Sequence, residues 1–362
     1  MRTENSGVYV IAAGGTGGHV FPGIALAREI RARRPEAEVL FVGSRHGLES
    51  KLVPQAGFPL ELVRASGFAG KPAAAKLFAL ALLSAGFFQA RRLLSDRHAL
   101  AVAGVGGYVT VPVVSAARSL GVPTLIHESN AFPGIANRFL NRFATRTAVG
   151  IAAANSRLSR PGVVTGTPVR PEFFSVPALD PAATTRRLLV FGGSQGSRVL
   201  NRAMAAVVGI LAPDGLEVIH QTGEREFEDT RARYGELPAG WRLVPFLPRI
   251  HEELAWADLV LARAGSQTLA ELAAAGRPSI LVPFGRATHA HQTENARVFS
   301  TAGAASAIDE SALSAGVLSR AVADLLGDRR RLTEMGEAAR AFARPDAARL
   351  LADLLFEAEG TR

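Results

Sequence analysis

The segment VYVIAAGGTGGHVFPGIALAREI, residues 8–30, joins an apolar run, a glycine-rich turn and a stretch with helical spacing. The segment RLLVFGGSQGSRVLNRAMAAVV, residues 187–208, has the same order of parts. A strand, a glycine turn and a helix open a doubly wound nucleotide-binding domain. Two such openings predict two similar α/β domains, which we expect to face each other across a cleft.

The rest of the chain alternates short apolar runs with longer alanine-rich stretches. Apolar runs without polar alternation are typical of parallel strands covered on both faces. We therefore expect two Rossmann-like sheets with right-handed crossovers. Prolines in residues 169–186 predict the join, with domains at 1–168 and 169–345. A final helix at 346–357 fits either domain.

Composition narrows the class of protein. The chain has 362 residues, of which 48% are hydrophobic, so it can bury a large core. It contains no cysteine, which excludes disulfides, thiolate metal sites and cysteine catalysis. Its net charge of +9 favours an anionic partner, or merely reflects an arginine-rich surface. Residues 8–13 are too short for a secretory signal and no run spans a bilayer, so we expect a soluble or peripheral cytoplasmic protein.

Polar residues of the first domain follow predicted strands. His19 begins a helix, where an imidazole either takes a proton from a hydroxyl or only caps the helix. The turn before it is neither a dinucleotide fingerprint nor a P-loop. Gly106-Gly107-Tyr108 and His127-Glu128-Ser129-Asn130 also follow strands. These residues form either a ligand site at the carboxyl ends of the strands or a satisfied hydrogen-bond network.

The second domain has its own candidates. The hydroxyl of Ser194 and nearby backbone amides can cradle a diphosphate, or the turn can be purely structural. Glu271 completes a T-x-x-E pattern with Thr268, so it either caps a helix or accepts hydrogen bonds from a ribose diol. His291 and Gln292 suit sugar hydroxyls better than a metal, because no carboxylate at ligand spacing completes the set and no D-x-D pair occurs.

A helix predicted within residues 71–97 has a different character. It carries bulky apolar side chains all round with basic residues near both ends; those we assign to a membrane contact are Lys76, Leu77, Leu80, Phe87, Phe88, Arg91 and Arg92. An apolar face with a basic rim favours docking onto an anionic leaflet. A buried core helix is the alternative.

Seven motifs, taken together and in order, resemble those of the MurG family of bacterial N-acetylglucosaminyltransferases. They are GGTGGHVFPGIALA, GVGGYVTVP, HESNAFPGIANRFL, GTPVR, GGSQGSRVLN, RAGSQTLAELAAAGRPSILVPF and HAHQTENA. The resemblance implies a GT-B fold, with the donor bound mainly in the second domain, the acceptor in the first, and residues 346–362 crossing back to the first. It implies transfer of N-acetylglucosamine from UDP-N-acetylglucosamine to the C4 hydroxyl of undecaprenyl-pyrophosphoryl-muramyl-pentapeptide in peptidoglycan synthesis.

The resemblance also implies roles for individual residues. The donor would contact Thr16, Gly17, Gly18, Asn130, Arg170, Ser194, Leu247, Ser266, Gln267, Thr268, Glu271, His291 and Gln292. In this set Arg170 and the backbone at Leu247 would meet uracil, and Glu271 the ribose. Gly106, Gly107 and Tyr108 would lie on the acceptor side. Thr167, Ser129 and Ala264 replace residues common in the family, but none of these changes removes a charged or imidazole group.

The implied reaction is a single inverting displacement that releases UDP. His19 is the first candidate for the base, with His127 and Glu128 as alternatives. Helix N-termini at Ser194 and Ser266, rather than a metal, would stabilise the leaving diphosphate, so no cofactor is expected. The implied partners are both substrates, the anionic cytoplasmic face of the plasma membrane and other cell-wall synthesis proteins.

Other functions fit part of the pattern. A UDP-N-acetylglucosamine 2-epimerase, or a transferase with another acceptor, would share the donor motifs. A non-catalytic nucleotide-sugar-binding subunit is disfavoured because both glycine turns and His19 occur in one chain. A nucleic-acid binder rests only on the net charge, because no interleaving of aromatic and basic residues supports it.

Overall fold

The computed structural model describes residues 7–45, 47–66, 73–212, 215–285 and 290–361, with the backbone alone at 73–78 and 290. The chain divides into two compact units, and each is described by itself. The first unit is Met1–Val169 with Arg344–Arg362, and the second is Arg170–Ala343. These divisions lie close to the predicted join at 168–169 and to the predicted start of the last helix at residue 346.

The first unit is built on a parallel sheet with strand order β3-β2-β1-β4-β5-β6-β7. Its strands are β1 Val8–Ala13, β2 Glu38–Gly43, β3 Leu60–Leu62, β4 Ala99–Gly106, β5 Thr124–Glu128, β6 Arg146–Val149 and β7 Val163–Val164. Strands β1 and β5 are buried throughout, as expected of strands covered on both faces. The chain leaves β1 toward β2 on one side and later returns to β4 on the other. Ligands bind at such a switch point, outside the carboxyl ends of the strands.

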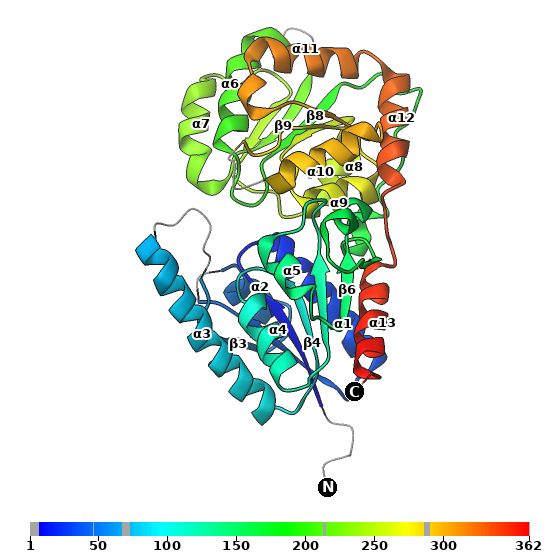
Figure 1. Ribbon diagram of the computed structural model, residues 1–362. Coiled ribbons are helices and arrows are strands. Elements are labelled where there is room, and N and C mark those ends of the chain that lie inside the picture. Colours follow the sequence, from blue (N-terminus) through cyan, green and yellow to red (C-terminus); the bar gives the residue numbers. More distant parts are fainter. Residues whose placement is uncertain (1–6, 46, 67–72, 213–214, 286–289, 362) are drawn as a thin grey trace. The chain divides into compact units, whose positions relative to one another are not determined.

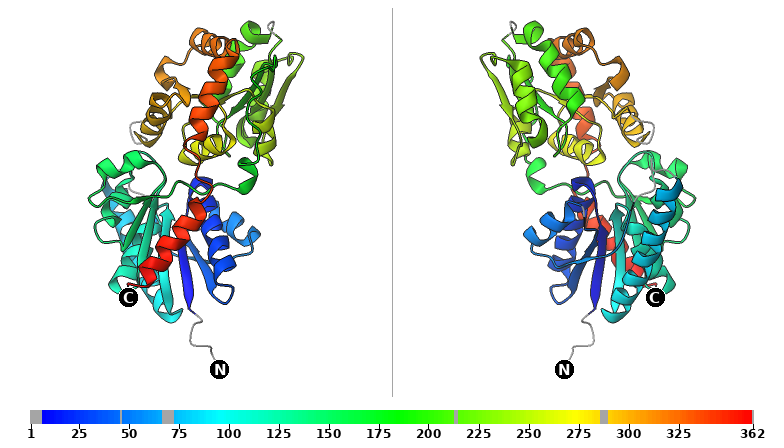
Figure 2. Two further views of the ribbon diagram at one scale, coloured as in Figure 1. Left: turned by 90° about the vertical axis from the view of Figure 1, so that its right-hand side faces the viewer. Right: turned by 90° about the vertical axis from the view of Figure 1, so that its left-hand side faces the viewer.

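Two layers of helices cover this sheet (Figures 1 and 2). One core cluster joins the sheet to α1 Gly17–Arg33, α2 Glu49–Gln55 and α13 Ala347–Glu359. Another joins the opposite face to α3 Ala73–Asp96, α4 Thr110–Ser119 and α5 Ile135–Leu140. A 3₁₀ turn, η1, spans Ala152–Arg157. The helices α3, α4 and α5 therefore form one continuous outer layer.

The C-terminal helix α13 packs on the first unit. The hydroxyl of Tyr9 in β1 donates to Glu359 at 2.6 Å, and Arg34 contacts the same carboxylate at 2.6 Å. Arg34 also lies over the ring of Phe356, 4.1 Å from its centroid. Because Leu351 and Leu355 of α13 are fully buried, apolar packing adds to these polar contacts.

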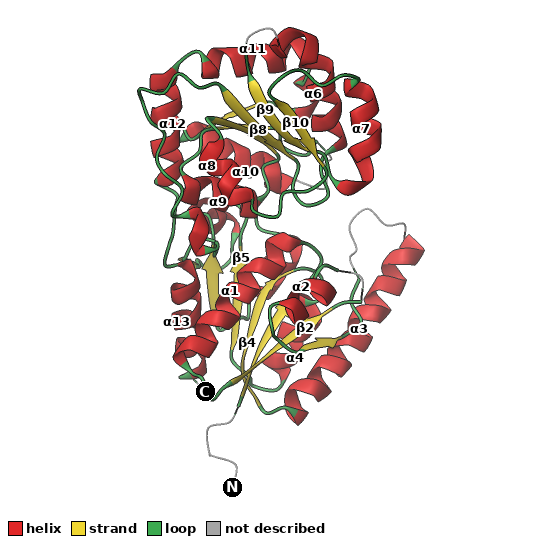
Figure 3. Ribbon diagram, turned by 180° about the vertical axis from the view of Figure 1, so that it is seen from behind, coloured by secondary structure: helices red, strands yellow, loops and turns green. Residues whose placement is uncertain are grey.

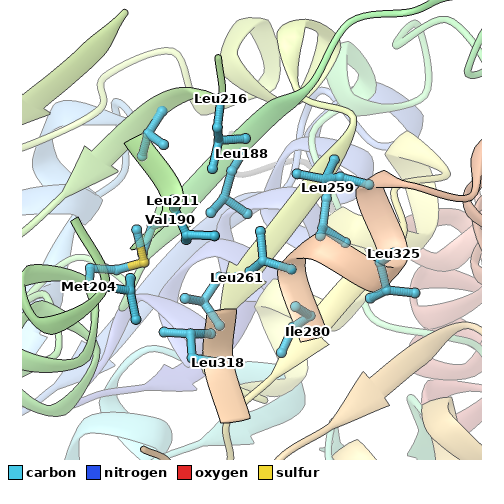
Figure 4. Close-up of a cluster of buried hydrophobic side chains, with 14 of the residues drawn as sticks. Leu188, Val190, Met204, Leu211, Leu216, Leu259, Leu261, Ile280, Leu318 and Leu325 are labelled. Carbon is cyan, nitrogen blue, oxygen red and sulfur yellow. The ribbon is translucent and has the colours of Figure 1, made fainter. Parts of the chain in front are cut away.

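The second unit repeats the architecture with strand order β10-β9-β8-β11-β12-β13 (Figure 3). Its strands are β8 Arg187–Phe191, β9 Glu217–Gln221, β10 Trp241–Val244, β11 Leu259–Ala262, β12 Ser279–Leu281 and β13 Ala305–Ala307. Its helices are α6 Arg198–Leu211, α7 Phe227–Tyr234, α8 Ile250–Trp256, α9 Ser266–Ala275, α10 Ala290–Thr301, α11 Ala315–Leu326 and α12 Arg329–Arg340, with 3₁₀ turns η2 Pro171–Phe173, η4 Glu224–Glu226 and η6 Glu310–Ala312. Leucines of β8, β11, α6 and α11 interlock in its core (Figure 4).

The predicted α/β class, with two parallel-sheet Rossmann-like domains, is confirmed. Strand β13 was missed, because its sequence Ala305–Ala307 has none of the β-branched or aromatic residues that mark a strand. Helix α3 has 24 residues and lies within the range 71–97 that the sequence predicted for it. No helix within the described part of the chain is both long and apolar enough to cross a membrane.

Candidate functional site

In each unit some of the predicted site residues lie at the carboxyl ends of the two strands that flank the switch point, and others follow β5, β10 and β12. In the first unit, β1 leads into Gly14 and β4 ends at Gly106, and these strands pair side by side. In the second unit, β8 leads into Gly192 and β11 leads into Arg263, and these strands are also neighbours. The sequence pattern thus produces one candidate half-site in each sheet.

His19 lies in the first turn of α1 and is held by the glycine turn before it. Its Nδ1 is 3.1 Å from the carbonyl oxygen of Gly14. A carbonyl only accepts hydrogen bonds, so this contact places a proton on Nδ1. The Nε2 atom of the neutral ring then carries the lone pair. A half-buried imidazole in this state is suited to take a proton from a hydroxyl.

Two glycines at the end of β4 make room for this arrangement. Gly106 has φ of 122° and Gly107 has φ of 85°, which side chains rarely adopt. A Cβ atom at Gly106 would collide with the imidazole of His19, and one at Gly107 would collide with the carbonyl of Gly14. The next residue, Tyr108, has a side chain that is 56% exposed. The end of β4 is therefore shaped around the turn that carries His19.

Glu128 organises the loop that follows β5. Its side chain is only 3% exposed, and its carboxylate accepts from the backbone N–H and the side-chain amide of Asn130 at 2.9 and 3.0 Å. It also accepts from the N–H of Gly134 and the amide of Asn137, both at 2.9 Å. With four donors on its two oxygens, this carboxylate fixes Asn130 and the start of α5.

His127 is buried, 1% exposed, and its Nε2 lies 3.0 Å from the carbonyl oxygen of Gly166. By the reasoning used for His19, Nε2 holds the proton and Nδ1 the lone pair. That Nδ1 has no hydrogen-bond partner among the described residues. Burial lowers the pKa of His127 and nearby His19 lowers it further, although the Gly166 bond and the Glu128 charge oppose this. His127 is thus a neutral group in the wall behind His19.

Glu49 belongs to this half-site but was not predicted. It is fully buried and accepts from the N–H of Gly15 at 2.9 Å. Its other oxygen accepts from the backbone N–H and the hydroxyl of Ser44, at 2.9 and 2.8 Å. The carboxylate therefore pins the glycine turn beside Thr16, Gly17 and Gly18. The one sequence signal that could have found Glu49 is its position shortly after β2, because β2 ends at the same edge of the sheet as β1 and β4.

The second half-site has two helix N-termini on neighbouring strands. The turn from Gly192 leads into α6, which Ser197 caps by accepting from Leu200 N–H at 3.4 Å. Ser194 is exposed in this turn. Helix α9 begins at Ser266 directly after β11. Two such helix N-termini favour the binding of an anion such as a diphosphate.

Glu271 does not form the capping box that its sequence pattern allowed. Gly265 caps α9, so Thr268 already lies inside the helix. Instead the amide of Gln267 donates to Glu271 at 3.1 Å, while the Gln267 carbonyl oxygen has no partner among the described residues. Burial raises the pKa of Glu271 to about 7, although the Gln267 bond and the charge of Arg170 oppose the rise. A carboxyl in this setting changes charge near neutral pH.

Arg170 and Leu247 are the predicted uracil contacts. Arg170 lies over the ring of Phe173, 5.1 Å from its centroid, and its charge reaches Glu271. Leu247 is buried in the loop after β10. The structure thus brings Arg170 close to Glu271 but gives no contact that links Leu247 to either of them.

Gln292 and His291 lie in the first turn of α10. The carbonyl oxygen of Gln292 accepts from the N–H of Phe284 at 3.0 Å, which turns its amide nitrogen outward as a donor. Buried Asn295 donates to the carbonyl of Ala264 at 3.0 Å and ties α10 to the turn before α9. His289, the first residue of the motif HAHQTENA, lies outside the described residues. No group of three or more potential metal ligands occurs among the described residues.

Two buried networks beneath this half-site were not predicted. Arg263 donates to Ser197 at 2.9 Å and to Glu310 at 2.6 Å, linking the cap of α6 to η6. Asn201 donates to the carbonyl of Thr222 at 3.0 Å and contacts His220 Nε2 at 3.1 Å. Burial lowers the pKa of His220 to about 3, so it stays neutral. These networks hold the glycine turn against β9 and β12. Arg263 and Asn201 lie within two of the quoted motifs, but the motifs do not identify their partners.

The predicted membrane contact lies on α3. Leu80 is 54% and Phe88 68% exposed, while Phe87 is half-buried against the core. Arg92 is exposed, and Arg91 donates to the carbonyl of Ser119 at 3.2 Å. The side chains of Lys76 and Leu77 lie outside the described residues. Part of α3 is thus a core helix and part presents apolar groups to solvent.

Two protein-family matches divide the chain in the same way as its two structural units. Residues 9–149 match the glycosyltransferase family 28 N-terminal domain, and residues 187–351 match the corresponding C-terminal domain. The UDP-N-acetylglucosamine--N-acetylmuramyl-(pentapeptide) pyrophosphoryl-undecaprenol N-acetylglucosamine transferase of Methylococcus capsulatus is 42% identical, covering 97% of this chain and 98% of its own. The protein of the same name from Halorhodospira halophila is 43% identical, covering 93% and 94%.

Solved structures show the same relationship. The crystal structure of MurG from Acinetobacter baumannii aligns with a TM-score of 0.80 and 31% identity, covering 97% of this chain and 99% of its own. A structure described as a putative UDP-N-acetylglucosamine 2-epimerase from Listeria monocytogenes aligns with a TM-score of 0.67 at 14% identity, covering 95% and 94%. At that identity the likeness concerns the fold alone.

Proposed function

Because this chain belongs to glycosyltransferase family 28, and within it to the MurG transferases, we propose that it transfers N-acetylglucosamine from UDP-N-acetylglucosamine to undecaprenyl-pyrophosphoryl-muramyl-pentapeptide. The observation that carries the proposal is the pair of glycine turns at the two switch points. One holds a basic imidazole at His19, and the other opens α6 beside α9. A base and an anion site are what the displacement of a diphosphate requires.

His19 is the base in this proposal. Its Nε2 takes the proton from the C4 hydroxyl of the muramyl sugar as the oxygen bonds to the anomeric carbon of the donor. The bond from that carbon to the diphosphate oxygen breaks, its electron pair leaves with UDP, and the configuration inverts. His127 and Glu128 are poor alternatives because both are buried, and the Glu128 carboxylate already accepts four hydrogen bonds.

The second unit binds the donor. The N-termini of α6 and α9, with Ser194 in the turn before α6 and Ser266, Gln267 and Thr268 at the start of α9, stabilise the departing diphosphate. Ionised Glu271 accepts the ribose hydroxyls, and Arg170 with the backbone at Leu247 contacts uracil. His291 and the outward amide of Gln292 donate to the sugar hydroxyls.

The first unit binds the acceptor and the remaining part of the sugar. Gly106, Gly107 and Tyr108 line the acceptor side beside His19, and the loop held by Glu128 presents Asn130 to the sugar, with Thr16, Gly17 and Gly18. The apolar side chains of α3 dock this unit on the cytoplasmic face of the plasma membrane, where the lipid-linked acceptor is anchored. Other cell-wall synthesis proteins are further partners in this proposal.

One assay tests the proposed reaction. Purified protein is incubated with UDP-N-acetylglucosamine, with and without the polyprenyl-linked muramyl acceptor, and UDP release is followed. We expect release only with the acceptor, in equal amount to the disaccharide product. Acceptor-independent conversion of the donor to its 2-epimer would instead favour the epimerase alternative and overturn the proposal.

A further inference from the structure

The first unit also carries a basic pocket at the opposite edge of its sheet, where β5 and β6 begin. The pocket has a volume of about 370 Å³, and its lining includes Arg118, Arg146 and Arg160 but no acidic residue. Glu128 and Asn130 lie at the other, carboxyl end of β5, and His19 follows β1 at that same edge of the sheet. This pocket is therefore separate from the candidate half-site.

Its arginines keep most of their hydrogen-bonding capacity. Arg118, in the last turn of α4, forms no ion pair or side-chain hydrogen bond within the described part of the chain. The Arg160 guanidinium makes one recorded hydrogen bond, to the carbonyl of Ala144 at 2.9 Å, and it has five N–H groups. The guanidinium of Arg146 lies 3.7 Å from the carboxylate of Glu357. Among the described residues, this is the one contact between any of the three arginines and a carboxylate. The pocket has a net positive charge.

Buried polar groups keep the pocket in shape. The side chain of Asn141 is fully buried and holds Arg160 at both backbone groups, donating to its carbonyl at 2.8 Å and accepting from its N–H at 2.9 Å. Thr124 and Thr145 exchange backbone-to-hydroxyl hydrogen bonds of 3.0 and 3.1 Å across β5 and the start of β6. The positions of these basic groups are thus set by the fold.

An exposed apolar surface adjoins the pocket. Phe143 lines the pocket, and its ring lies edge-on to that of Phe139, with 5.3 Å between centroids. Phe139 is 47% exposed, and Ile135, one helical turn earlier in α5, is 83% exposed. The exposed Arg138 and Arg142 flank this surface, with no ion pair among the described residues. A basic pocket beside exposed apolar side chains matches an anionic lipid, which has a phosphate at one end and acyl chains at the other.

We propose that Arg118, Arg146 and Arg160 form a binding pocket for the phosphate headgroup of an anionic phospholipid, whose chains contact Phe139 and Ile135. The inference rests on the proposed membrane docking, since Arg118 in α4 and Phe143 after α5 join the pocket to the α3–α4–α5 layer that carries the exposed side chains of α3, while Thr361 after α13 completes the lining. Arg91 of α3 donates to Ser119, directly after Arg118, so the two surfaces are adjacent.

Vesicle co-sedimentation of the full chain tests the pocket. The probes are vesicles of phosphatidylcholine alone and of phosphatidylcholine with phosphatidylglycerol. We expect R118Q/R160Q to bind the anionic vesicles about 25-fold more weakly than the wild type, at about fivefold for each charge lost near the surface. Binding to the neutral vesicles, and transfer to a short-chain soluble acceptor, are expected to be unchanged.

The matched control is R28Q/K51Q, which removes the same charge from exposed positions in α1 and α2, on the other face of the sheet. Arg118→Glu is the second variant, because the Arg118 side chain forms no ion pair or hydrogen bond with the other described residues that the substitution could break. If the wild type, R118Q/R160Q and R118E bind anionic vesicles equally well, the proposed lipid-binding pocket is wrong. It is also wrong if R118Q/R160Q and the control lose vesicle binding to the same extent.

Two further arms separate the remaining explanations. In the first arm, millimolar inorganic phosphate is added to the anionic vesicles at constant ionic strength. If it displaces the protein, the pocket binds a soluble phosphate and the proposal of a lipid ligand is wrong. The I135S/F139S variant should lose binding to anionic vesicles while staying monomeric. If the wild type is a dimer and this variant is a monomer, a second copy of the chain covers α5 and the proposal is wrong. If no UDP is released with any acceptor but vesicle binding still depends on Arg118, the proposed function fails and the pocket stands.

Discussion

The Nδ1 atom of His19 lies 3.1 Å from the carbonyl oxygen of Gly14, five residues earlier in the chain. This contact sets the tautomer of the ring, because a carbonyl oxygen cannot donate a proton. It leaves Nε2 as the basic atom in the half-site of the first unit. The glycine turn thus decides which nitrogen of His19 can accept a proton.

Replacing His19 by alanine should lower turnover by about 10²–10⁴-fold, the range for loss of a general base. The KM for UDP-N-acetylglucosamine should stay within about twofold, because donor contacts lie mainly in the second unit. Steady-state kinetics with both substrates varied measures this split. His98→Asn is the control, since His98 is exposed and has a φ of 49° that asparagine tolerates. A turnover as high as that of the control would remove His19 from the mechanism.

Gly106→Ala should displace His19, because the added methyl group would occupy the space of the imidazole. Gly57→Ala is the matched control: Gly57 also has a positive φ, 80°, but has open space around it. Both variants should lose about 1–2 kcal/mol of stability from backbone strain, and only Gly106→Ala should lose turnover. In a His19→Ala background, Gly106→Ala should have no further effect on turnover. Additive losses would mean that Gly106 acts independently of His19.

Glu128→Gln should destabilise the first unit by about 1–3 kcal/mol, because the new amide end would face N–H donors. Thermal unfolding monitored by circular dichroism measures this loss, with the exposed Glu36→Gln as control. Turnover should fall and become more temperature-dependent as the loop carrying Asn130 loosens. A variant with wild-type stability that loses turnover would instead favour Glu128 as the base.

Glu271 should make donor binding depend on pH. Its pKa of about 7 means that the carboxyl takes up a proton as pH falls below 7, and a protonated carboxyl accepts fewer hydrogen bonds from the ribose. The KM for the donor should therefore rise as pH falls from 8 to 6, approaching tenfold per unit below 7. Glu271→Gln should bind the donor weakly at every pH and abolish this dependence. An unchanged slope in the variant would assign the titration to another group.

The same carboxyl predicts a change in stability with the opposite sign. Its pKa in the folded state is above the ordinary value of 4.5, so the folded state binds more protons between about pH 4.5 and 7. Its contribution to stability is therefore present below that window and is lost as pH rises through it. Denaturant unfolding of Glu271→Gln should show a smaller decline over this range than the wild type. Parallel curves for the two proteins would contradict the raised pKa.

Removal of divalent metal should leave turnover unchanged, because helices α6 and α9 supply N–H groups for the diphosphate. The test is the UDP-release assay in the presence of excess chelator. Activity within about twofold of the untreated enzyme is expected. A loss that added Mg²⁺ restores would mean that a cation shares the charge of the leaving group.

The fold was predictable because its signals are local. Glycines after β1 and β8, and apolar runs without alternation, predicted both sheets and the edges where His19, Ser194 and Glu271 lie. What was missed depends on contacts between distant segments. Glu49 reaches Gly15 across 34 residues, and Arg263 reaches Glu310 across 47. The position of each residue shortly after a strand was the only local signal, and it does not identify the partner of either charge.

The roles within the predicted site required side-chain geometry. From the sequence, His19 was the first candidate for the base, with His127 and Glu128 as alternatives, and all three follow strands. Burial separates them, since His127 is 1% and Glu128 3% exposed while His19 is only half-buried. The capping role considered for Glu271 failed because the N-cap of α9 is Gly265, three residues before Thr268, which the pattern implied as the N-cap. A shift of that size changes which side chain faces the helix end.

The configuration of the product tests the proposed displacement most directly. Wild-type enzyme is supplied with UDP-α-N-acetylglucosamine and a short-chain muramyl acceptor, and the new glycosidic bond is examined by NMR through its anomeric coupling. A β-1,4 linkage formed in equal amount to UDP is the expected result. An α linkage, or a glycosyl group bound covalently to the protein, would contradict a one-step attack assisted by His19.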